Sequence, residues 1–424
     1  MIRADNDRMD TGQDVVTEYL KLGLRFDRVV SGFVDAYTGD PALRRAVDDE
    51  PAPDPADLAR QATRLVAAVG DADLSAQRVD FLTAHLQALA VAGRRLAGQE
   101  MGFVAEVAGY FQVEIDLVDE DVFAAAHARL DELLPGRGDL LDRLAALREL
   151  ELCPPDQVER VVRVIAADLR ERVAGPTGLP AGEHIDFEIA RDVAWSGFNY
   201  YLGDFSSRVA VNADIGHRMS QLGVLVAHEC YPGHHTEHCR KEDLLVRQGG
   251  QAEQTIFLVN TPQCVMAEGL GDLALSAAIG PGWGRWLSEL FDANFGPVGD
   301  AGRPVPGFDA DLAEELELAS RPLNAVRQNA AILLHDRGRP VSEVQEYLQR
   351  WSLAGPEQAA QRLRFLTDPL WRAYVSTYVE GERLLRPWLD ARPAEQSALE
   401  RFRRLLDEPL TPVAIRAELA GASV

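Results

Sequence analysis

The segment Val226-Ala-His-Glu-Cys-Tyr-Pro-Gly-His-His-Thr-Glu237 decides how this chain is interpreted. A His followed directly by Glu on an apolar helix, with a further His downstream, is how many zinc hydrolases hold their metal and their general base. The apolar run 221–227 predicts a buried helix that delivers His228 and Glu229 to the interior. We therefore expect a metal site in this part of the chain.

The spacing of the His residues departs from the usual four-residue separation. His234 and His235 follow His228 by six and seven residues, and six residues of unbroken helix rotate a side chain by about 600°, away from the first His. Pro232 removes a backbone donor and clashes with the preceding turn, and Gly233 accepts unusual dihedral angles. A local bulge around this dipeptide is expected to return His234 to the metal-facing side.

A catalytic zinc site needs a third protein ligand and an open position for water. Glu268, on the apolar helix that follows, is the expected ligand. Asp272 lies one helical turn further on the same face, where its carboxylate can hold the outer nitrogen of a ligand His. The sequence thus predicts one Zn²⁺ per chain, bound by His228, His234 and Glu268.

The other His and Cys residues near the expected ligands are interpreted as surface or core residues and not as ligands. His235 and His238 are expected at the surface or behind the ligands, although the residues alone leave His235 open as a replacement for His234. Cys230 and Cys239 are expected to be small core residues, because no paired Cys spacing indicates a structural zinc site.

The composition limits the classes of partner. The chain has 43 Lys and Arg against 67 Asp and Glu, for a net charge of −24, so nucleic acid and anionic membranes are disfavoured. The first 14 residues are polar and lack the apolar core of a signal peptide. The four Cys are scattered and form no disulfide framework. We therefore expect a cytoplasmic protein.

Helical periodicity dominates, which predicts a mainly α fold. A Gly- and Pro-rich linker at 175–182 divides an N-terminal helical lobe, 1–180, from a metal-binding and C-terminal lobe, 181–424, although one continuous domain is compatible with the pattern. Alternating residues after the linker predict a small antiparallel sheet. The expected helices are 14–36, 56–70, 75–97, 119–133, 138–151, 154–173, 383–407 and 411–420, and the expected strands are 185–189, 196–202 and 207–212.

The motif His-Glu-x-x-Pro-Gly-His with a downstream Glu-Gly resembles the bacterial family known as domain of unknown function 885. That family is similar to the helical gluzincin metallopeptidases of the angiotensin-converting enzyme and Taq carboxypeptidase type. The resemblance covers about 185–385: Arg327 and His335 fit an Arg-x7-His helix, and Tyr378 fits a Tyr-x-x-Gly motif. It implies a two-lobed zincin-like fold with a deep central cleft, and it favours His234 over His235 as the ligand.

The resemblance also implies an activity, a zinc-dependent metallopeptidase that hydrolyses short peptides by metal-activated water. Glu229 is then the general base, Tyr378 and His335 are donors to the developing oxyanion, and Arg327 binds a substrate carboxylate. The strand that includes Val209, Val211 and Asn212 is expected to present an exposed edge that pairs with an extended substrate.

Two alternatives stay open at this point. The same metal, base and donors serve a zinc amidohydrolase that acts on a non-peptide amide. A non-catalytic helical protein with a structural metal site is the third interpretation, and Glu229 argues against it because a structural site has no use for a general base. The sequence leaves open the oligomeric state and whether cleavage is terminal or internal.

Overall fold

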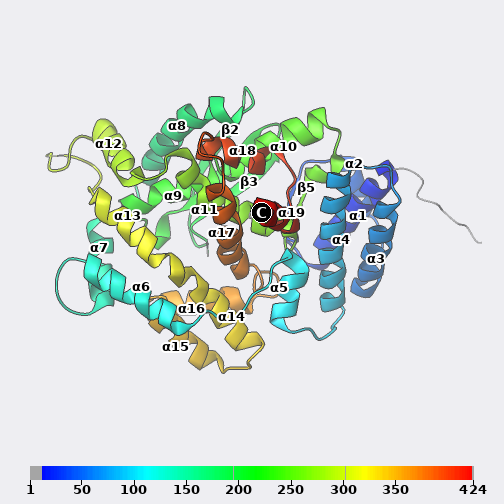
Figure 1. The fold of residues 1–424 in the computed structure, drawn as a ribbon, viewed down its shortest axis with the longest axis horizontal. Helices are drawn as coiled ribbons and strands as arrows, with labels where there is room; N and C mark the ends of the chain where they lie inside the picture. Colours follow the sequence, from blue (N-terminus) through cyan, green and yellow to red (C-terminus); the bar gives the residue numbers. More distant parts are fainter. Residues whose placement is uncertain (1–11, 194, 301, 423–424) are drawn as a thin grey trace, which may run out of the picture.

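A computed structural model describes residues 12–193, 195–300 and 302–422, and this part of the chain is mainly helical, as predicted (Figure 1). Most of the polar N-terminal segment, on which the expectation of no targeting sequence rests, lies outside the described residues. Among the described residues, no helix combines the length and the apolar character that a membrane span requires.

The first half of the chain forms most of the outer helices and ends in the sheet next to the metal-binding segment. Its elements are α1 (Gly12–Val29), β1 (Val34–Tyr37), α2 (Pro41–Asp48), α3 (Pro55–Gly70), α4 (Ala76–Leu96), α5 (Phe103–Phe111), α6 (Glu120–Leu133), α7 (Leu140–Leu150), α8 (Val158–Thr177), β2 (His184–Ala190), β3 (Gly197–Gly203) and β4 (Ser206–Asn212).

The second half is helical apart from one short strand. Its elements are α9 (Met219–Glu229), α10 (His234–Lys241), β5 (Ile256–Leu258), α11 (Pro262–Ala278), α12 (Trp283–Phe295), α13 (Ala310–Ser320), α14 (Ala325–His335), α15 (Val341–Trp351), α16 (Pro356–Thr367), α17 (Val375–Asp390), α18 (Ala398–Asp407) and α19 (Pro412–Ala422).

The predicted helix over 14–36 is too long, because α1 ends at Val29 and β1 follows. The carboxylate of Asp27 accepts hydrogen bonds from the backbone N–H groups of Gly32 and Val34 at 3.2 and 3.1 Å. Gly32 has a φ of 85°, a left-handed conformation that glycine adopts readily. These features end the helix and turn the chain into β1, which pairs with the distant strand β5.

The predicted helix over 383–407 is two helices. Helix α17 ends at Asp390, and α18 begins after Ser397, whose side chain accepts from the backbone N–H of Glu400 at 3.2 Å while the Glu400 carboxylate accepts from the Ser397 N–H at 2.7 Å. This capping box satisfies two N–H groups that a helix start leaves without partners. Helix α8, in turn, extends to Thr177, three residues into the predicted linker.

The three predicted strands form a sheet of order β2-β4-β3, but the sheet is mixed and not antiparallel. Strands β3 and β4 form a hairpin whose turn residues, Asp204 and Phe205, have φ values of 51° and 57°. Strand β2 pairs with the other side of β4 in parallel. Strand β4 is therefore the central strand, and the prediction that it offers an exposed edge is wrong.

Helices α11 and α17 lie at the centre of the molecule, between the N-terminal helices α1–α4 and the group α6 and α13–α16 (Figure 1). They approach closely because Gly269 faces Gly381: a Cβ on Gly269 would lie 2.6 Å from the Gly381 backbone. The main hydrophobic core extends from Val15 to Ile415 and so includes residues of both predicted lobes. The division at residue 180 stays a prediction.

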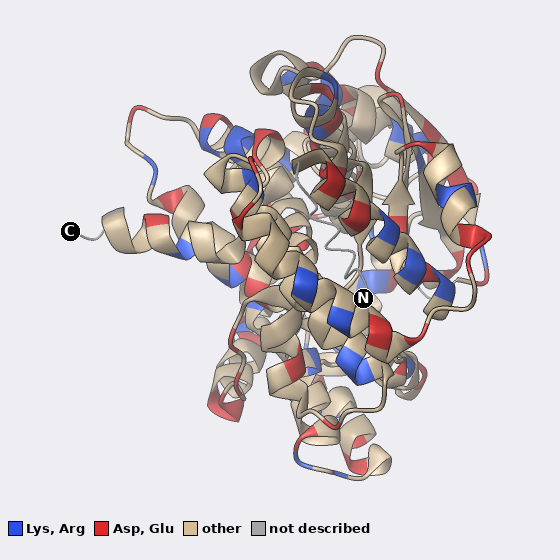
Figure 2. Ribbon diagram, turned by 90° about the vertical axis from the view of Figure 1, so that its right-hand side faces the viewer, with Lys and Arg blue, Asp and Glu red and all other residues tan. Residues whose placement is uncertain are grey.

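Acidic and basic residues are mixed over the helices visible in Figure 2, and the acidic residues lie on many elements. Several of these charges form ion pairs one helical turn apart, such as Arg163 with Glu159 at 2.8 Å and Arg404 with Glu408 at 2.8 Å. Exposed pairs of this kind contribute little to stability, on the order of 0.5 kcal/mol each. The charged surface therefore gives no separate indication of function.

Candidate metal centre

The structure brings His228, His234 and Glu268 together from three helices, α9, α10 and α11. One ligand atom of each lies within 4.8 Å of the others, and no other group of three potential ligands meets this condition in the described part of the chain. His228 Nε2 lies 3.4 Å from Glu268 Oε2, and the two imidazole rings are 4.6 Å apart and nearly perpendicular. This geometry suits a tetrahedral metal with one position left for water.

Each of the three side chains is held on the side that faces away from the others. His228 Nδ1 lies 3.2 Å from Asp272 Oδ1, and His234 Nδ1 lies 3.8 Å from Glu237 Oε2. On Glu268, Oε1 accepts from the hydroxyl of Tyr374 at 2.6 Å, whereas the buried Oε2 has no hydrogen-bond partner. Carboxylate partners of this kind orient metal-binding His residues, and a buried oxygen without a partner is costly unless a cation binds it. The residues therefore fit a zinc ion.

The break between α9 and α10 accounts for the unusual spacing of the two His. A Cβ on Gly233 would lie 1.9 Å from the carbonyl oxygen of His228, so only glycine fits there. The Gly233 N–H donates to the Ala227 carbonyl at 3.0 Å, and the Thr236 side chain donates to the Cys230 carbonyl at 3.1 Å. The expected bulge is a complete break, after which a new helix begins at His234.

A second glycine sets the position of the His228 ring. Gly271 lies on α11, and a Cβ there would lie within 2.6–2.7 Å of three atoms of the imidazole. The ring thus packs directly on the helix backbone between Glu268 and Asp272. The motif Glu268-Gly-Leu-Gly-Asp272 therefore supplies a ligand, an outer partner and a flat surface for the other ligand.

The charged groups of the centre shift one another's pKa values. Burial disfavours protonation of His228, but its contacts with Asp272 and Glu268 outweigh burial and raise its pKa well above the usual range. Burial raises the pKa of Glu229, which brings this carboxyl closer to the range of a general base at neutral pH. For Glu268, burial is opposed by His228 and His234, which lower the pKa of that carboxyl.

Of the predicted substrate-side residues, Tyr378 and Arg327 lie near the centre. The charges of Glu268, Asp272 and Glu229 raise the pKa of Tyr378, after the larger effect of burial. The guanidinium of Arg327 lies 5.2 Å from the centre of the Tyr378 ring. Tyr374, one helical turn before Tyr378 and in contact with Glu268, was missed by the sequence analysis, although its spacing of four from Tyr378 would have placed it on the same face.

His335 does not join this cluster. Its Nε2 lies 2.8 Å from the carbonyl oxygen of Leu366, and its ring stacks on Phe103 with the centroids 5.3 Å apart. The charges that act on it are those of Arg372, Glu106 and Arg95. An oxyanion donor must face the reacting group, so this structure gives His335 a packing role at the end of α14 and not the predicted one.

The three predicted residues of β4 are structural as well. Val209, Val211 and Asn212 are buried, and both sides of their strand are paired. The side-chain amide of Asn212 donates to the carbonyls of Val193 and Trp195 at 3.0 Å, and its oxygen accepts from the Asp214 N–H at 2.9 Å. Because β2 and β3 pair with both of its sides, the strand offers no free edge to an extended substrate.

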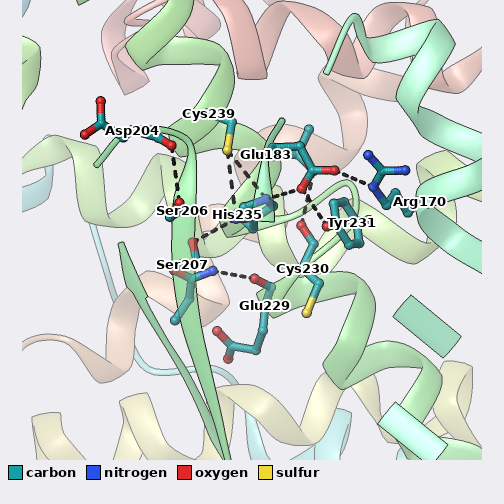
Figure 3. A network of polar contacts seen from close by, with 12 residues as sticks. Arg170, Glu183, Asp204, Ser206, Ser207, Glu229, Cys230, Tyr231, His235 and Cys239 are labelled. Atoms are coloured by element: carbon teal, nitrogen blue, oxygen red, sulfur yellow. Dashed lines mark hydrogen bonds and ion pairs between the residues drawn. The ribbon is translucent and has the colours of Figure 1, made fainter. Parts of the chain in front are cut away.

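A buried polar network lies behind the metal-binding segment (Figure 3). His235 is fully buried, with Nε2 2.7 Å from Glu183 and Nδ1 2.8 Å from the hydroxyl of Ser207. Tyr231 donates to the same carboxylate at 2.7 Å, and Arg170 donates to its other oxygen. Burial opposes ionisation of Glu183, yet these three donors lower its pKa to about 2. His235 therefore supports the segment from behind and does not replace His234.

The remaining residues around the metal-binding segment pack in the core or hold its backbone in place. Cys230 and Cys239 are buried and free. The half-buried His238 stacks on Tyr201, with ring centroids 4.6 Å apart. The amide of Asn199, on β3, donates to the Glu229 carbonyl at 2.7 Å and fixes the end of α9.

Comparisons with known proteins indicate the fold and leave the activity open. No protein-family model and no curated protein matches the chain. A solved protein described as a "putative lipoprotein" from Colwellia psychrerythraea aligns with 99% of this chain and 78% of its own length, at 14% identity and a TM-score of 0.51. Another, a "putative lipoprotein of unknown function" from Shewanella oneidensis, aligns with 89% of this chain and 76% of its own, at 14% identity and a TM-score of 0.49.

These comparisons correct three expectations. The resemblance to domain of unknown function 885 is wrong as a family assignment, since no family model matches. The prediction of a zinc peptidase for short peptides is contradicted, because the solved neighbour from Colwellia psychrerythraea is described only as a lipoprotein and no peptidase family matches. The cytoplasmic location is contradicted by the same description. The motif constrains a few residues around one metal position, and neither lineage nor substrate follows from it.

Proposed function

We propose that this chain binds one divalent metal ion, zinc by preference, through His228, His234 and Glu268, and that it is a metal-dependent hydrolase. The observation that carries the proposal is the convergence of these three ligand atoms within 4.8 Å, with one buried Glu268 oxygen that accepts no hydrogen bond. Two imidazoles and one carboxylate are a ligand set that suits zinc better than magnesium or calcium.

The ligands keep contact with solvent. The side chains of the ligands His228, His234 and Glu268 are 12%, 14% and 8% exposed. A structural zinc site is usually closed by four protein ligands, whereas a catalytic site keeps a position for water or substrate. Three ligands with residual exposure therefore favour a catalytic role over a structural one.

When bound in such a site, a zinc ion would lower the pKa of water toward 7 and polarise the oxygen of an electrophile. Glu229, next to a ligand and buried, is the residue that would accept a proton from the attacking water and return it to the leaving group. Tyr378 is the donor that would stabilise negative charge on the attacked oxygen. Arg327 would hold Tyr378 in place or bind an anionic group of the substrate.

Elemental analysis of the purified protein tests the metal site. We expect one zinc per chain in the wild type and its loss in His228→Ala and in Glu268→Ala. His335→Ala is the matched control, because this half-buried His contacts Leu366 and Phe103 instead of the centre, and it should retain the metal. A wild type without zinc after reconstitution, or zinc retained in both ligand variants, contradicts the proposal.

Glu229→Gln tests the hydrolytic role separately. The variant should retain zinc and lose activity by a factor on the order of 10²–10⁴ on whichever chromogenic amide, ester or phosphoester the wild type cleaves. Equal activity of the two proteins would show that Glu229 is no general base. Such a result would leave a metal-binding protein without the proposed mechanism.

A further inference from the structure

A cavity of about 600 Å³ lies beside helix α17, away from the metal ligands. Helix α17 forms one wall, and the start of α6 and the short 3₁₀ helix Arg321–Asn324, which leads into α14, form the others. Its volume is in the range of pockets that hold small organic ligands. None of the residues that line it is a metal ligand or the general base, so the proposed hydrolysis leaves this cavity unexplained.

Part of the cavity wall is apolar. The apolar residues come from all three walls and are Val118, Val122, Pro322, Ala325, Val379 and Pro387. Val122 is 42% exposed, so apolar surface at this cavity is left in contact with water. Because removal of apolar surface from water is favourable, this part of the wall favours a ligand with an apolar portion.

Three guanidinium groups line the rest of the cavity, those of Arg321, Arg383 and Arg386. Arg386 donates to Glu382 Oε1 through Nε at 2.9 Å, and Arg321 Nε lies 3.7 Å from the same oxygen. Arg383 donates to Glu380 at 2.9 Å. In the described part of the chain these arginines form no ion pair with any other carboxylate. Three positive charges therefore share two negative ones.

Two further acidic residues near the cavity do not balance the excess positive charge. Asp390 is 67% exposed and lies 3.8 Å from Arg392, which is outside the lining. Glu317 forms no ion pair with Arg321, and burial raises the pKa of its carboxyl, which disfavours the charged form. A guanidinium keeps its proton at physiological pH, so only an anion can balance it.

Two adjacent buried amides of α14 hold the walls of the cavity in place. Asn329 accepts from the backbone N–H of Val118 at 2.9 Å and donates to the carbonyl of the same residue at 2.7 Å. Gln328 donates at 3.0 Å to Glu380, the carboxylate that also holds Arg383. The apolar wall and the cationic wall are therefore fixed before a ligand arrives, which lowers the cost of binding.

We infer that this cavity binds a small amphiphilic anion, an apolar chain that ends in a carboxylate. Arg321 is the group that binds the carboxylate, because it is 30% exposed and makes no hydrogen bond with the described residues. Its planar guanidinium offers paired donors that match the two oxygens of a carboxylate. The chain lies against Val122 and Val379. The site is separate from the metal centre and does not depend on it.

Calorimetric titration of the purified chain, with and without zinc, tests the inference. Octanoate is the probe, and octylammonium is the matched probe with the opposite charge. Octanoate should fill one saturable site with a dissociation constant on the order of 0.1–1 mM. Octylammonium should bind at least about tenfold more weakly, because its charge has the same sign as the guanidinium groups. The zinc-free titration keeps the result independent of the metal centre.

Two variants change the two walls separately. Arg321→Gln removes the guanidinium and should weaken octanoate about tenfold, with an unchanged thermal unfolding temperature because this Arg makes no hydrogen bond. Val122→Trp, at a partly exposed position, fills the apolar side and should weaken octanoate by a similar factor without a change in charge. Arg403→Gln is the matched control: this Arg on α18 is 45% exposed, pairs with Asp407 at 3.0 Å and lies outside the cavity, so the variant should bind octanoate like the wild type.

Three results would overturn the inference. The first is the absence of saturable octanoate binding to the wild type. The second is octylammonium binding as tight as that of octanoate, which would exclude recognition of the negative charge. The third is wild-type affinity for octanoate in Arg321→Gln or in Val122→Trp, which would place the ligand outside this cavity. Each of these results leaves the metal site standing, since elemental analysis measures zinc separately.

Discussion

Replacement of Glu183 by Gln should destabilise the metal-free protein by about 3 kcal/mol at pH 7, and this loss should shrink as the pH falls. Glu183 is a fully buried carboxylate with donors from Arg170, Tyr231 and His235. Two of these donors lie within or next to the segment that carries His234. The carboxylate therefore links the stability of the fold to the position of a ligand.

The magnitude follows from the pKa of Glu183, which the three donors lower from 4.5 to about 2 against the opposing effect of burial. Each unit of such a shift corresponds to about 1.4 kcal/mol, so the difference amounts to about 3 kcal/mol. Because the pKa is lower in the folded protein, this stabilisation is complete above about pH 5. It decreases as the pH falls through 4.5 toward 2, and about 2 kcal/mol of it is lost by pH 3.

The assay is guanidinium denaturation of the metal-free protein, followed by Trp fluorescence, at several values between pH 7 and pH 3. Glu183→Gln should differ from the wild type by about 3 kcal/mol at pH 7 and by about 1 kcal/mol at pH 3. Glu50→Gln is the control, because this carboxylate also bonds an Arg in two places but is 32% exposed. Its removal should cost at most about 1 kcal/mol.

A destabilisation by Glu183→Gln that stays constant from pH 7 to pH 3 would refute this account, because the lost interaction would then not depend on ionisation. A cost no larger than that of Glu50→Gln would refute it as well. The variant should also bind zinc more weakly than the wild type, since His235 and Tyr231 lose their common acceptor.

Three further predictions concern the metal centre itself. Zinc affinity should rise with pH between 6 and 8, because His228, whose pKa is raised in the metal-free protein, must lose its proton, and calorimetry should show a smaller slope in Asp272→Asn. Gly271→Ala should lower zinc affinity at least about tenfold by displacing the imidazole, whereas Gly175→Ala, with open space around it, should leave the affinity unchanged. Tyr374→Phe should weaken zinc binding several-fold in a chelator competition, since the ligand carboxylate loses a donor at 2.6 Å.

The sequence predicted those parts of the site that depend on local chain geometry. The buried helix that carries His228 and Glu229, an irregularity at Pro232-Gly233 and the spacing of Glu268 and Asp272 follow from periodicity and from the properties of Pro and Gly. The structure brings these side chains together, although the irregularity is a complete helix break and not the predicted bulge. Most of the helices for which bounds were predicted also begin and end within a few residues of them. Local rules suffice where the partners of a residue lie within one or two turns of it.

The failures have the opposite cause. Residues 34–36 of strand β1 were predicted as helix. Their pairing partner, strand β5, lies far along the chain, and the periodicity of four residues does not reveal such a pairing. The parallel pairing of β2 with β4 depends on strand order, which alternation of side chains does not determine. His335 was assigned to the site from its spacing to Arg327, whereas packing against Phe103 decides where its ring lies.

The same distinction explains why a sound metal geometry coexists with a wrong family assignment. A His-Glu pair, a helix break and a second carboxylate helix are enough to gather three ligands, and a few residues can supply them in any large helical core. The substrate of an enzyme, by contrast, is selected by contacts beyond the ligands, and elements far apart in the sequence make them. Two proteins can therefore share the metal-binding segment and differ in every contact that determines what is cleaved, so the chemistry of this protein has to be inferred from the residues opposite the ligands.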